Sequence, residues 1–206
     1  MLEDDPIVFI VDDDDSVRKA LTRLINSVGL NVETFASADD FLKRESHDGP
    51  ACLVLDIRMP GLSGLDLQDE LVAAGRAFPI IFISGHGNIP ISVRAMKAGA
   101  VDFIEKPFED QALLDAINHS LKKDRQTKLE QAELREIQQL VDSLTPRERE
   151  VFTLVVSGKL NKQIAFELGT TERTIKAHRA RVMKKMQAKS LADLIRLAEK
   201  VISYPV

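Results

Sequence analysis

The sequence is poor in the residues that build several common kinds of site. Among its 206 residues there are one cysteine, Cys52, four histidines and no tryptophan. A single cysteine cannot form a disulfide within the chain or a cysteine-rich zinc site, and the histidines lack the spacing of metal ligands. The longest apolar runs, such as residues 79–83, fall far short of the roughly 20 residues of a membrane helix, and the acidic N-terminus does not resemble a signal peptide. We therefore expect a cytoplasmic protein with no membrane partner.

Charge is unevenly distributed along the chain. Residues 1–123 hold 12 basic and 21 acidic residues, whereas residues 142–206 hold 13 basic and 7 acidic ones. An acidic front and a basic back indicate two modules with different partners, and the basic module is a candidate for binding nucleic acid. Ordinary surface charge would give the same imbalance, so charge alone leaves the question open.

The first half alternates short apolar runs with helical patterns. The strand-like runs are residues 7–11, 31–35, 53–55, 80–83 and 101–105. The helical patterns between and after them are residues 16–28, 37–42, 64–74, 89–98 and a helix that begins near Asp110. Five strand–helix units with short connections predict an α/β fold with a doubly wound, five-stranded parallel sheet. Ligands of such a sheet bind beyond the carboxyl ends of its strands.

The second half has the pattern of an all-helical domain. Thr145, Pro146 and Glu148 form the N-cap, the first-turn proline and the capping box of a helix that ends at Gly158. Further helices are predicted over residues 161–168, 171–186 and 190–202.

The segment between the halves, residues 122–137, has few apolar residues and lacks the Gly and Ser of a flexible linker, which predicts a helical linker. Leu134, Ile137, Val141 and Leu144 recur at 3-4-3 spacing. This stripe fits packing on the neighbouring domain or, alternatively, a short coiled-coil seam.

Polar residues follow four of the five predicted strands at the point where each strand ends. They are Asp12 and Asp13, Asp56, Ser84 and Lys106. Carboxylates at close range repel one another unless a cation neutralises them, and oxygen ligands with few protein contacts suit Mg²⁺. Lys106 and Ser84 could then hold phosphate oxygens, and Asp56 could act as a carboxylate nucleophile that forms an acyl phosphate. Each residue alone could belong to a solvated turn, but their coincidence at four strand ends favours a phosphoryl-transfer site.

These residues form a recognisable pattern. It comprises residues 11–13, residues 55–61 with Gly64, residues 83–85 and residues 106–108. Over about residues 5–121 the chain resembles the receiver domain of bacterial two-component response regulators. The resemblance implies that Asp56 accepts a phosphoryl group from a cognate sensor histidine kinase.

The resemblance also implies a role for each neighbour of Asp56. Asp13 and Asp56, with the backbone carbonyl of Arg58, would hold Mg²⁺ (or Mn²⁺), and Asp12 would help through a water. The acidic run is four residues long, and we place the metal pair at Asp12 and Asp13 because they directly follow the strand. Ser84, where threonine is commoner, and Phe103 would form a switch pair. Lys106, joined to Pro107 by a cis bond, would contact the phosphoryl group, and Arg58 and His86 would tune its lifetime.

Residues 161–180 fit a helix-turn-helix, with Gly169 in the turn. The outward face of helix 171–186 mixes small residues with long cations, which suits a surface pressed into the major groove. Asn161 and Lys162, at the start of the preceding helix, suit phosphate contacts. A four-helix domain with a solvated basic face is the alternative. The expected DNA-contacting residues are Asn161, Lys162, Thr171, Arg173, Thr174, Lys176, Ala177, Arg179, Ala180, Arg181 and Lys184.

Several short motifs strengthen the DNA-binding interpretation. They are residues 144–151, Gly158, residues 161–165, residues 168–169 and residues 174–178. Over about residues 138–202 the chain resembles the LuxR-type DNA-binding domain. The resemblance implies a four-helix module that often dimerises through its last helix, here residues 190–202. For His178 we expect a packing or phosphate-bonding role rather than metal binding.

The order of receiver (5–121), helical linker (122–137) and LuxR-type domain (138–202) is typical of the FixJ/NarL class of response regulators. We expect phosphorylation of Asp56 to control dimerisation and binding to two-fold symmetric promoter DNA, with RNA polymerase as a further partner. Catalysis would be limited to the protein's own phosphorylation and dephosphorylation. Two alternatives are an aspartyl-phosphate phosphohydrolase with an accessory DNA domain, and a phosphorylation-independent DNA-binding protein or scaffold with a degenerate receiver.

Overall fold

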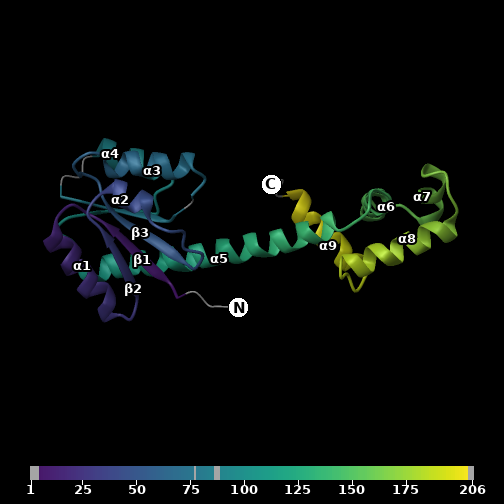
Figure 1. Ribbon diagram of the computed structural model, residues 1–206, viewed down its shortest axis with the longest axis horizontal. Helices are drawn as coiled ribbons and strands as arrows, with labels where there is room; N and C mark the ends of the chain where they lie inside the picture. Colours follow the sequence, from purple (N-terminus) through teal and green to yellow (C-terminus); the bar gives the residue numbers. More distant parts are fainter. Residues whose placement is uncertain (1–4, 77, 86–88, 204–206) are drawn as a thin grey trace. The chain divides into compact units, whose positions relative to one another are not determined.

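A computed structural model describes residues 5–76, 78–85 and 89–203 of the chain (Figure 1). The chain divides into two compact units after Lys128. The first unit contains β1 (Ile7–Val11), α1 (Asp15–Ser27), β2 (Asn31–Phe35), α2 (Ala38–Lys43), β3 (Ala51–Asp56), α3 (Gly64–Ala73), β4 (Ile80–Ser84), α4 (Ile89–Lys97), β5 (Asp102–Glu105) and the first part of α5 (Asp110–Asp142). The second unit contains the end of α5, with α6 (Pro146–Val156), α7 (Asn161–Glu167), α8 (Glu172–Lys185) and α9 (Leu191–Ser203).

The first unit is built on a five-stranded parallel sheet with strand order β2-β1-β3-β4-β5. Successive residues of a strand point to opposite faces, so Phe9 and Val11 of β1 enter one hydrophobic core while Val8 and Ile10 enter another. Helices α2, α3 and α4 contribute to the first core, and α1 and α5 to the second (Figure 1). The predicted doubly wound α/β fold is therefore confirmed.

The strands that were predicted from apolar runs are present, and two of them, β3 and β4, are longer than expected. β3 extends from Ala51 to Asp56, and all six of its residues are buried. The candidate nucleophile Asp56 is therefore the last residue of a fully buried strand rather than the first residue of a loop.

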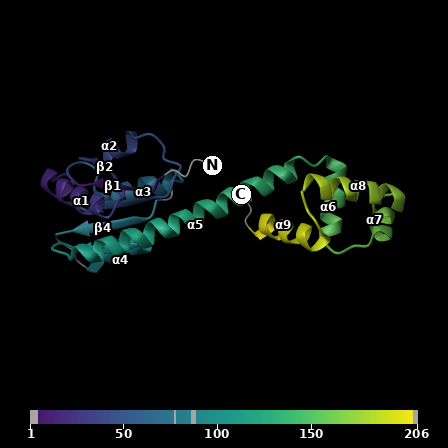
Figure 2. The ribbon, with the colours of Figure 1, turned by 90° about the horizontal axis from the view of Figure 1, so that it is seen from below.

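The helix that begins at Asp110 does not stop near residue 121. α5 continues to Asp142, so the segment expected to be a helical linker belongs to the same helix (Figure 2). No glycine or proline occurs between Phe108 and Thr145, so nothing in the sequence interrupts the backbone hydrogen bonding of the helix.

The second unit packs four helices and the end of α5 around one core. Its centre is formed by Val151 and Val155 of α6, Ile164 of α7, and Ile175 and Val182 of α8. Thr145 and Glu148 form the predicted capping box at the start of α6.

Most of the 3-4-3 stripe, which runs along the end of α5 into the turn after it, also lies in the core of the second unit. Ile137, Val141 and Leu144 are buried there, as packing on the neighbouring domain requires. Among the residues that the structure describes, no helix is both long enough and apolar enough to cross a membrane.

Candidate functional site

The carboxyl ends of four strands meet at one edge of the sheet. Asp12 follows β1, Asp56 ends β3, Ser84 ends β4, and Lys106 follows β5. A cavity of about 400 Å³ lies at this edge and is lined by these four residues and by Asp13. The structure thus brings together the charged and polar residues that the sequence placed at separate strand ends.

Lys106 bridges two buried carboxylates in this cavity. Its Nζ donates to Asp12 Oδ2 and to Asp56 Oδ1, both at 2.8 Å. Asp12 is 1% exposed and Asp56 is 7% exposed, and buried carboxylates of this kind require a charged partner.

Burial and the neighbouring opposite charges shift the pKa values of Asp56 and Lys106. Burial raises the pKa of Asp56, and the contacts with Lys106 only partly oppose this effect. Burial on its own would lower the pKa of Lys106, but the hydrogen bonds and charges of Asp12 and Asp56 outweigh it and raise this pKa. Lys106 is therefore a fixed cation at neutral pH.

The main chain around the cavity orients both carboxylates. The Arg58 N–H donates to Asp56 Oδ2 at 2.7 Å, and the Asp14 N–H donates to Asp12 Oδ1 at 2.9 Å. Arg18 of α1 donates to the Asp12 carbonyl oxygen at 2.7 Å. Sequence reasoning missed Arg18, because a spacing of six residues matches no recurrent motif.

The oxygen atoms at the cavity suit a divalent cation. Within the described ranges, no three His, Cys, Asp or Glu side chains are gathered into one ligand set; Asp13 is exposed and lines the cavity without joining the buried pair. Two buried carboxylates and a third at the cavity wall fit Mg²⁺, which takes few protein ligands and keeps several waters. The residues present therefore fit the expected ion.

The remaining residues expected at this site lie on β4, β5 and their loops. Ser84 is buried, and Phe103 is half-buried on the neighbouring strand β5. The bond between Lys106 and Pro107 is cis, and Pro107 is exposed. Arg58 is exposed, and His86 lies outside the described residues.

A second candidate site is the outward face of α8. Ile175 and Val182 bury one side of this helix in the core. The exposed side presents seven of the residues expected to contact DNA: Arg173, Thr174, Lys176, Ala177, Ala180, Arg181 and Lys184. This face combines cations with small side chains, as a surface that enters a major groove requires.

Three other residues expected at DNA also hold the helix-turn-helix together. The exposed Thr171 caps α8 by accepting a hydrogen bond from the Thr174 N–H at 3.2 Å. Arg179 donates to Asn161 Oδ1 at 3.0 Å, and both residues are half-buried. Arg179 and Asn161 thus join α8 to the start of α7, whereas Lys162, next to Asn161, is exposed.

An ion pair between the half-buried Lys185, at the end of α8, and the buried Glu148 was not predicted. Lys185 donates to Glu148 Oε2 at 2.6 Å and to the Ser143 carbonyl oxygen at 2.9 Å. The contact with Lys185, followed by the backbone of Thr145, lowers the pKa of Glu148 to about 2. Sequence patterns cannot reveal a pair 37 residues apart; only the capping role of Glu148 could be predicted.

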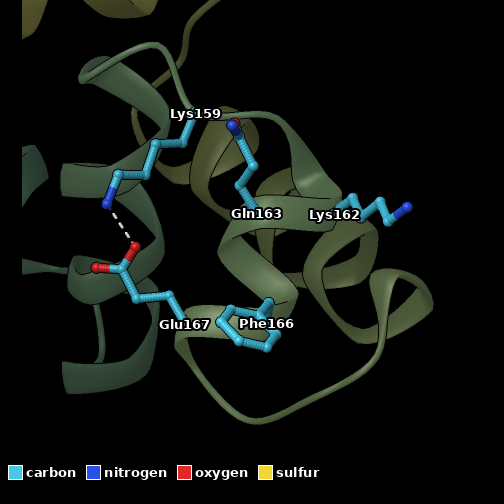
Figure 3. Close-up of a pocket in the computed structure, with 5 residues that line it drawn as sticks. All are labelled: Lys159, Lys162, Gln163, Phe166 and Glu167. Atoms are coloured by element: carbon cyan, nitrogen blue, oxygen red, sulfur yellow. Dashed lines mark hydrogen bonds and ion pairs between the residues drawn. The ribbon is translucent and has the colours of Figure 1, made fainter.

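A surface hollow of about 570 Å³ lies on α7 and is lined by Lys159, Lys162, Gln163, Phe166 and Glu167. Lys159 and Glu167 form an ion pair across it, whereas Lys162 points away (Figure 3). Phe166 is 91% exposed, which is unusual for a large aromatic side chain.

Comparison with known proteins finds a family match for each of the two units. The response regulator receiver domain matches residues 8–118, and the luxR family of bacterial regulatory proteins matches residues 142–198. The chain is 53% identical over 193 residues to nodulation protein W of Bradyrhizobium diazoefficiens, covering 94% of this chain and 85% of that protein.

Two full-length structures are also similar to this chain. The response regulator StyR has a TM-score of 0.88 and 49% identity, covering 95% of this chain and 99% of its own. Full-length FixJ from B. japonicum has a TM-score of 0.56 and 40% identity, covering 96% and 98%. With a receiver domain, a LuxR-type domain and these relatives, the chain belongs to the FixJ/NarL class of two-component response regulators, which pair a kinase partner with DNA binding to regulate transcription.

Proposed function

We propose that Asp56 is the phosphoacceptor of this regulator and that its phosphorylation controls binding to promoter DNA. The observation that carries the proposal is the position of Lys106 Nζ, 2.8 Å from both Asp12 and Asp56. A cation held at that point is available to the oxygens of a phosphoryl group on Asp56.

The transfer follows from the chemistry of the carboxylate. An oxygen of Asp56 forms a bond to phosphorus as the P–N bond of the phosphohistidine on the sensor kinase breaks, and the histidine leaves with the electron pair. Water later attacks the acyl phosphate, which restores Asp56 and releases phosphate. The protein is thus its own substrate and turns over no other.

Mg²⁺ (or Mn²⁺) is the proposed cofactor of both steps. Asp12, Asp13, Asp56 and the backbone carbonyl of Arg58 would hold it, and when bound it would neutralise charge on the phosphoryl oxygens. Lys106 supplies the second positive charge from the carboxyl end of β5.

Phosphorylation adds negative charge to the site, and we propose that Ser84 and Phe103 reorient in response. The Ser84 hydroxyl turns to the phosphoryl oxygens, and Phe103, half-buried on β5, follows it inward. The surface formed by α4, β5 and α5 then changes shape. Homodimerisation, through this surface or α9, follows from that change.

The second unit would read the promoter through α8 in the major groove, with Lys162 at the phosphates. A dimer would place two copies of α8 on a roughly two-fold symmetric site. RNA polymerase is the proposed further partner, supported by the exposed Phe166 and Leu160 of the DNA-binding unit. A cytoplasmic location is part of the proposal, because the chain would meet both the kinase and DNA there.

The test measures affinity for a selected promoter fragment with and without acetyl phosphate as the phosphodonor. Wild type should bind more tightly when phosphorylated, and Asp56→Asn should show no such gain. Equal affinity of Asp56→Asn and phosphorylated wild type would contradict the proposal. Release of many phosphates per chain from an added phosphate ester would instead indicate a phosphohydrolase.

A further inference from the structure

Two residues of α5 beyond the receiver match tie this helix to the strand that carries Asp56. The receiver family match ends at residue 118. The side chain of Asp124 nevertheless lies in the first unit, is 6% exposed, and accepts a hydrogen bond from the Ala51 N–H at 2.8 Å. Ala51 is the first residue of β3, and Asp56 is the last.

Lys128 completes this contact one helical turn further along. Its Nζ lies 3.1 Å from Asp124 Oδ2 and donates to the Gly49 carbonyl oxygen in the loop before β3. Burial, followed by the charge of Asp124, raises the pKa of Cys52, the next residue of the strand. One ion pair between a buried carboxylate and a half-buried lysine thus satisfies main-chain groups on both sides of the β3 start. We call Asp124 and Lys128 the α5 clamp.

The clamp lies on the same face of α5 as its apolar anchor. Ile117 and Leu121 pack in the core between the sheet and α5, and Asp124 and Lys128 follow them at helical spacing. After Lys128, no residue of α5 is buried until Ile137, which belongs to the core of the second unit. The clamp therefore sets where α5 leaves the first unit.

The length of helix without a buried side chain depends on the clamp. With the clamp, the last buried side chain is Asp124 and this stretch is residues 125–136, with Lys128 half-buried within it; without the clamp, the last buried side chain is Leu121 and the stretch becomes residues 122–136. In proteins most helical stability comes from tertiary packing rather than from intrinsic propensity, so the longer stretch without a buried side chain is more prone to fraying. A frayed helix cannot carry a change in the first unit to the second.

We propose that Asp124 and Lys128 are positioning residues for phosphorylation control: they lock the helix that connects the two units to the start of the phosphoacceptor strand. This inference rests on the proposed function. It requires that loss of the clamp leaves phosphorylation of Asp56 intact and abolishes the effect of phosphorylation on DNA binding.

The experiment compares full-length wild type, Asp124→Ala and the milder Lys128→Gln, which keeps the bond between Asp124 and Ala51. Asp115→Ala is the matched control, because Asp115 is exposed on α5 and its side chain accepts a hydrogen bond from Gln111 on the same helix. Three quantities are measured on each protein. They are amide exchange of Ala51 and residues 122–136, the mass gained with acetyl phosphate, and promoter affinity with and without this phosphodonor.

Both clamp variants should gain one phosphoryl group and bind DNA like unphosphorylated wild type. Exchange over residues 122–136 should accelerate by about tenfold or more in both variants, with the Ala51 amide accelerated most in Asp124→Ala. Their affinity ratio with and without acetyl phosphate should fall to about one, whereas Asp115→Ala should match wild type. A purely structural role would lower the melting temperature and leave this ratio unchanged.

Two results would overturn the inference. One is faster exchange in the clamp variants with an unchanged affinity ratio; the other is unchanged exchange in both. A wild-type ratio of one would instead refute the proposed phosphorylation control, and the exchange data would still decide whether the clamp holds the helix.

Discussion

Gly64 lies against the main chain of Asp56. A β-carbon built on Gly64 would come 2.2 Å from the Asp56 carbonyl oxygen and 3.1 Å from Ile57 Cα. The Gly64 N–H also donates to the Ile57 carbonyl oxygen at 3.0 Å. The first turn of α3 therefore closes onto the phosphoacceptor strand only because residue 64 has no side chain.

Gly64→Ala should displace the loop that orients Asp56. Overpacking of this kind typically costs about 1–3 kcal/mol of stability, and the shift should slow phosphorylation by acetyl phosphate, measured by intact mass over time. Asp115→Ala is the control, since Asp115 is exposed on α5 and its side chain accepts a hydrogen bond from Gln111. Equal phosphorylation rates in the two variants would show that the contact does not position Asp56.

Asp56→Asn should make the protein more stable at neutral pH. Burial raises the pKa of Asp56 above its ordinary value, so ionisation of Asp56 costs the folded state more than the unfolded chain. The penalty is absent below the ordinary aspartate pKa and grows as pH rises through the raised pKa. Urea unfolding from acid to neutral pH should show the stability difference from wild type growing with pH; a constant difference would contradict this origin.

Mg²⁺ and Mn²⁺ should raise the melting temperature of the wild-type protein. A ligand at ten times its dissociation constant adds about 1.4 kcal/mol to stability. Asp13→Asn and Asp12→Asn should lose most of this shift, whereas Asp115→Asn, on the exposed side of α5, should keep it. A shift that survives Asp12→Asn and Asp13→Asn would place the cation elsewhere.

The parts of the site that follow from local pattern could be predicted from sequence. Apolar runs located the strands, and the carboxyl ends of parallel strands share one edge, so the proximity of Asp12, Asp56 and Lys106 followed from topology alone. The exposed face of α8 followed in the same way from helical periodicity, because Ile175 and Val182 mark the buried side.

Contacts between distant residues could not be predicted in this way. The bond from Ala51 to Asp124 joins residues 73 apart, and Asp124 lies in a charged stretch with no distinguishing pattern. The hydrogen bond from Arg179 to Asn161 could not be predicted either, because each of these residues on its own fits a contact with a DNA phosphate. Periodicity reports which face of an element is buried, not which polar partner meets it there.

Glu148 should make the second unit sensitive to acid. Lys185 and the Thr145 backbone hold the pKa of Glu148 at about 2 in the folded protein, below its ordinary value of 4.5. Its contribution is therefore fully present above pH 4.5 and is lost as pH falls from there to about 2.

The free energy of unfolding is measured across that pH range, with the helical circular dichroism signal as the monitor of unfolding. Glu148→Gln should lower the free energy of unfolding above pH 4.5 and flatten its dependence on pH between 4.5 and about 2. Glu150→Gln is the control, because Glu150 is exposed and pairs with Arg147 on the surface. The ion pair would be unimportant if wild type and Glu148→Gln lost stability in parallel.

Two exposed lysines should affect DNA binding in different ways. Lys162, at the start of α7, is placed for phosphate contact, so Lys162→Ala should weaken binding to all sequences alike and reduce the salt dependence, log K against log salt, by about 0.9. Lys176 lies on the face of α8 that would enter the groove, and Lys176→Ala should cost about 1–3 kcal/mol on the promoter and less on random DNA. Fluorescence anisotropy over a salt series measures both effects, with Lys122→Ala of α5 as the control. If both variants lost affinity equally on promoter and random DNA, α8 would hold the backbone without reading bases, and specificity would have to come from the shape of the DNA.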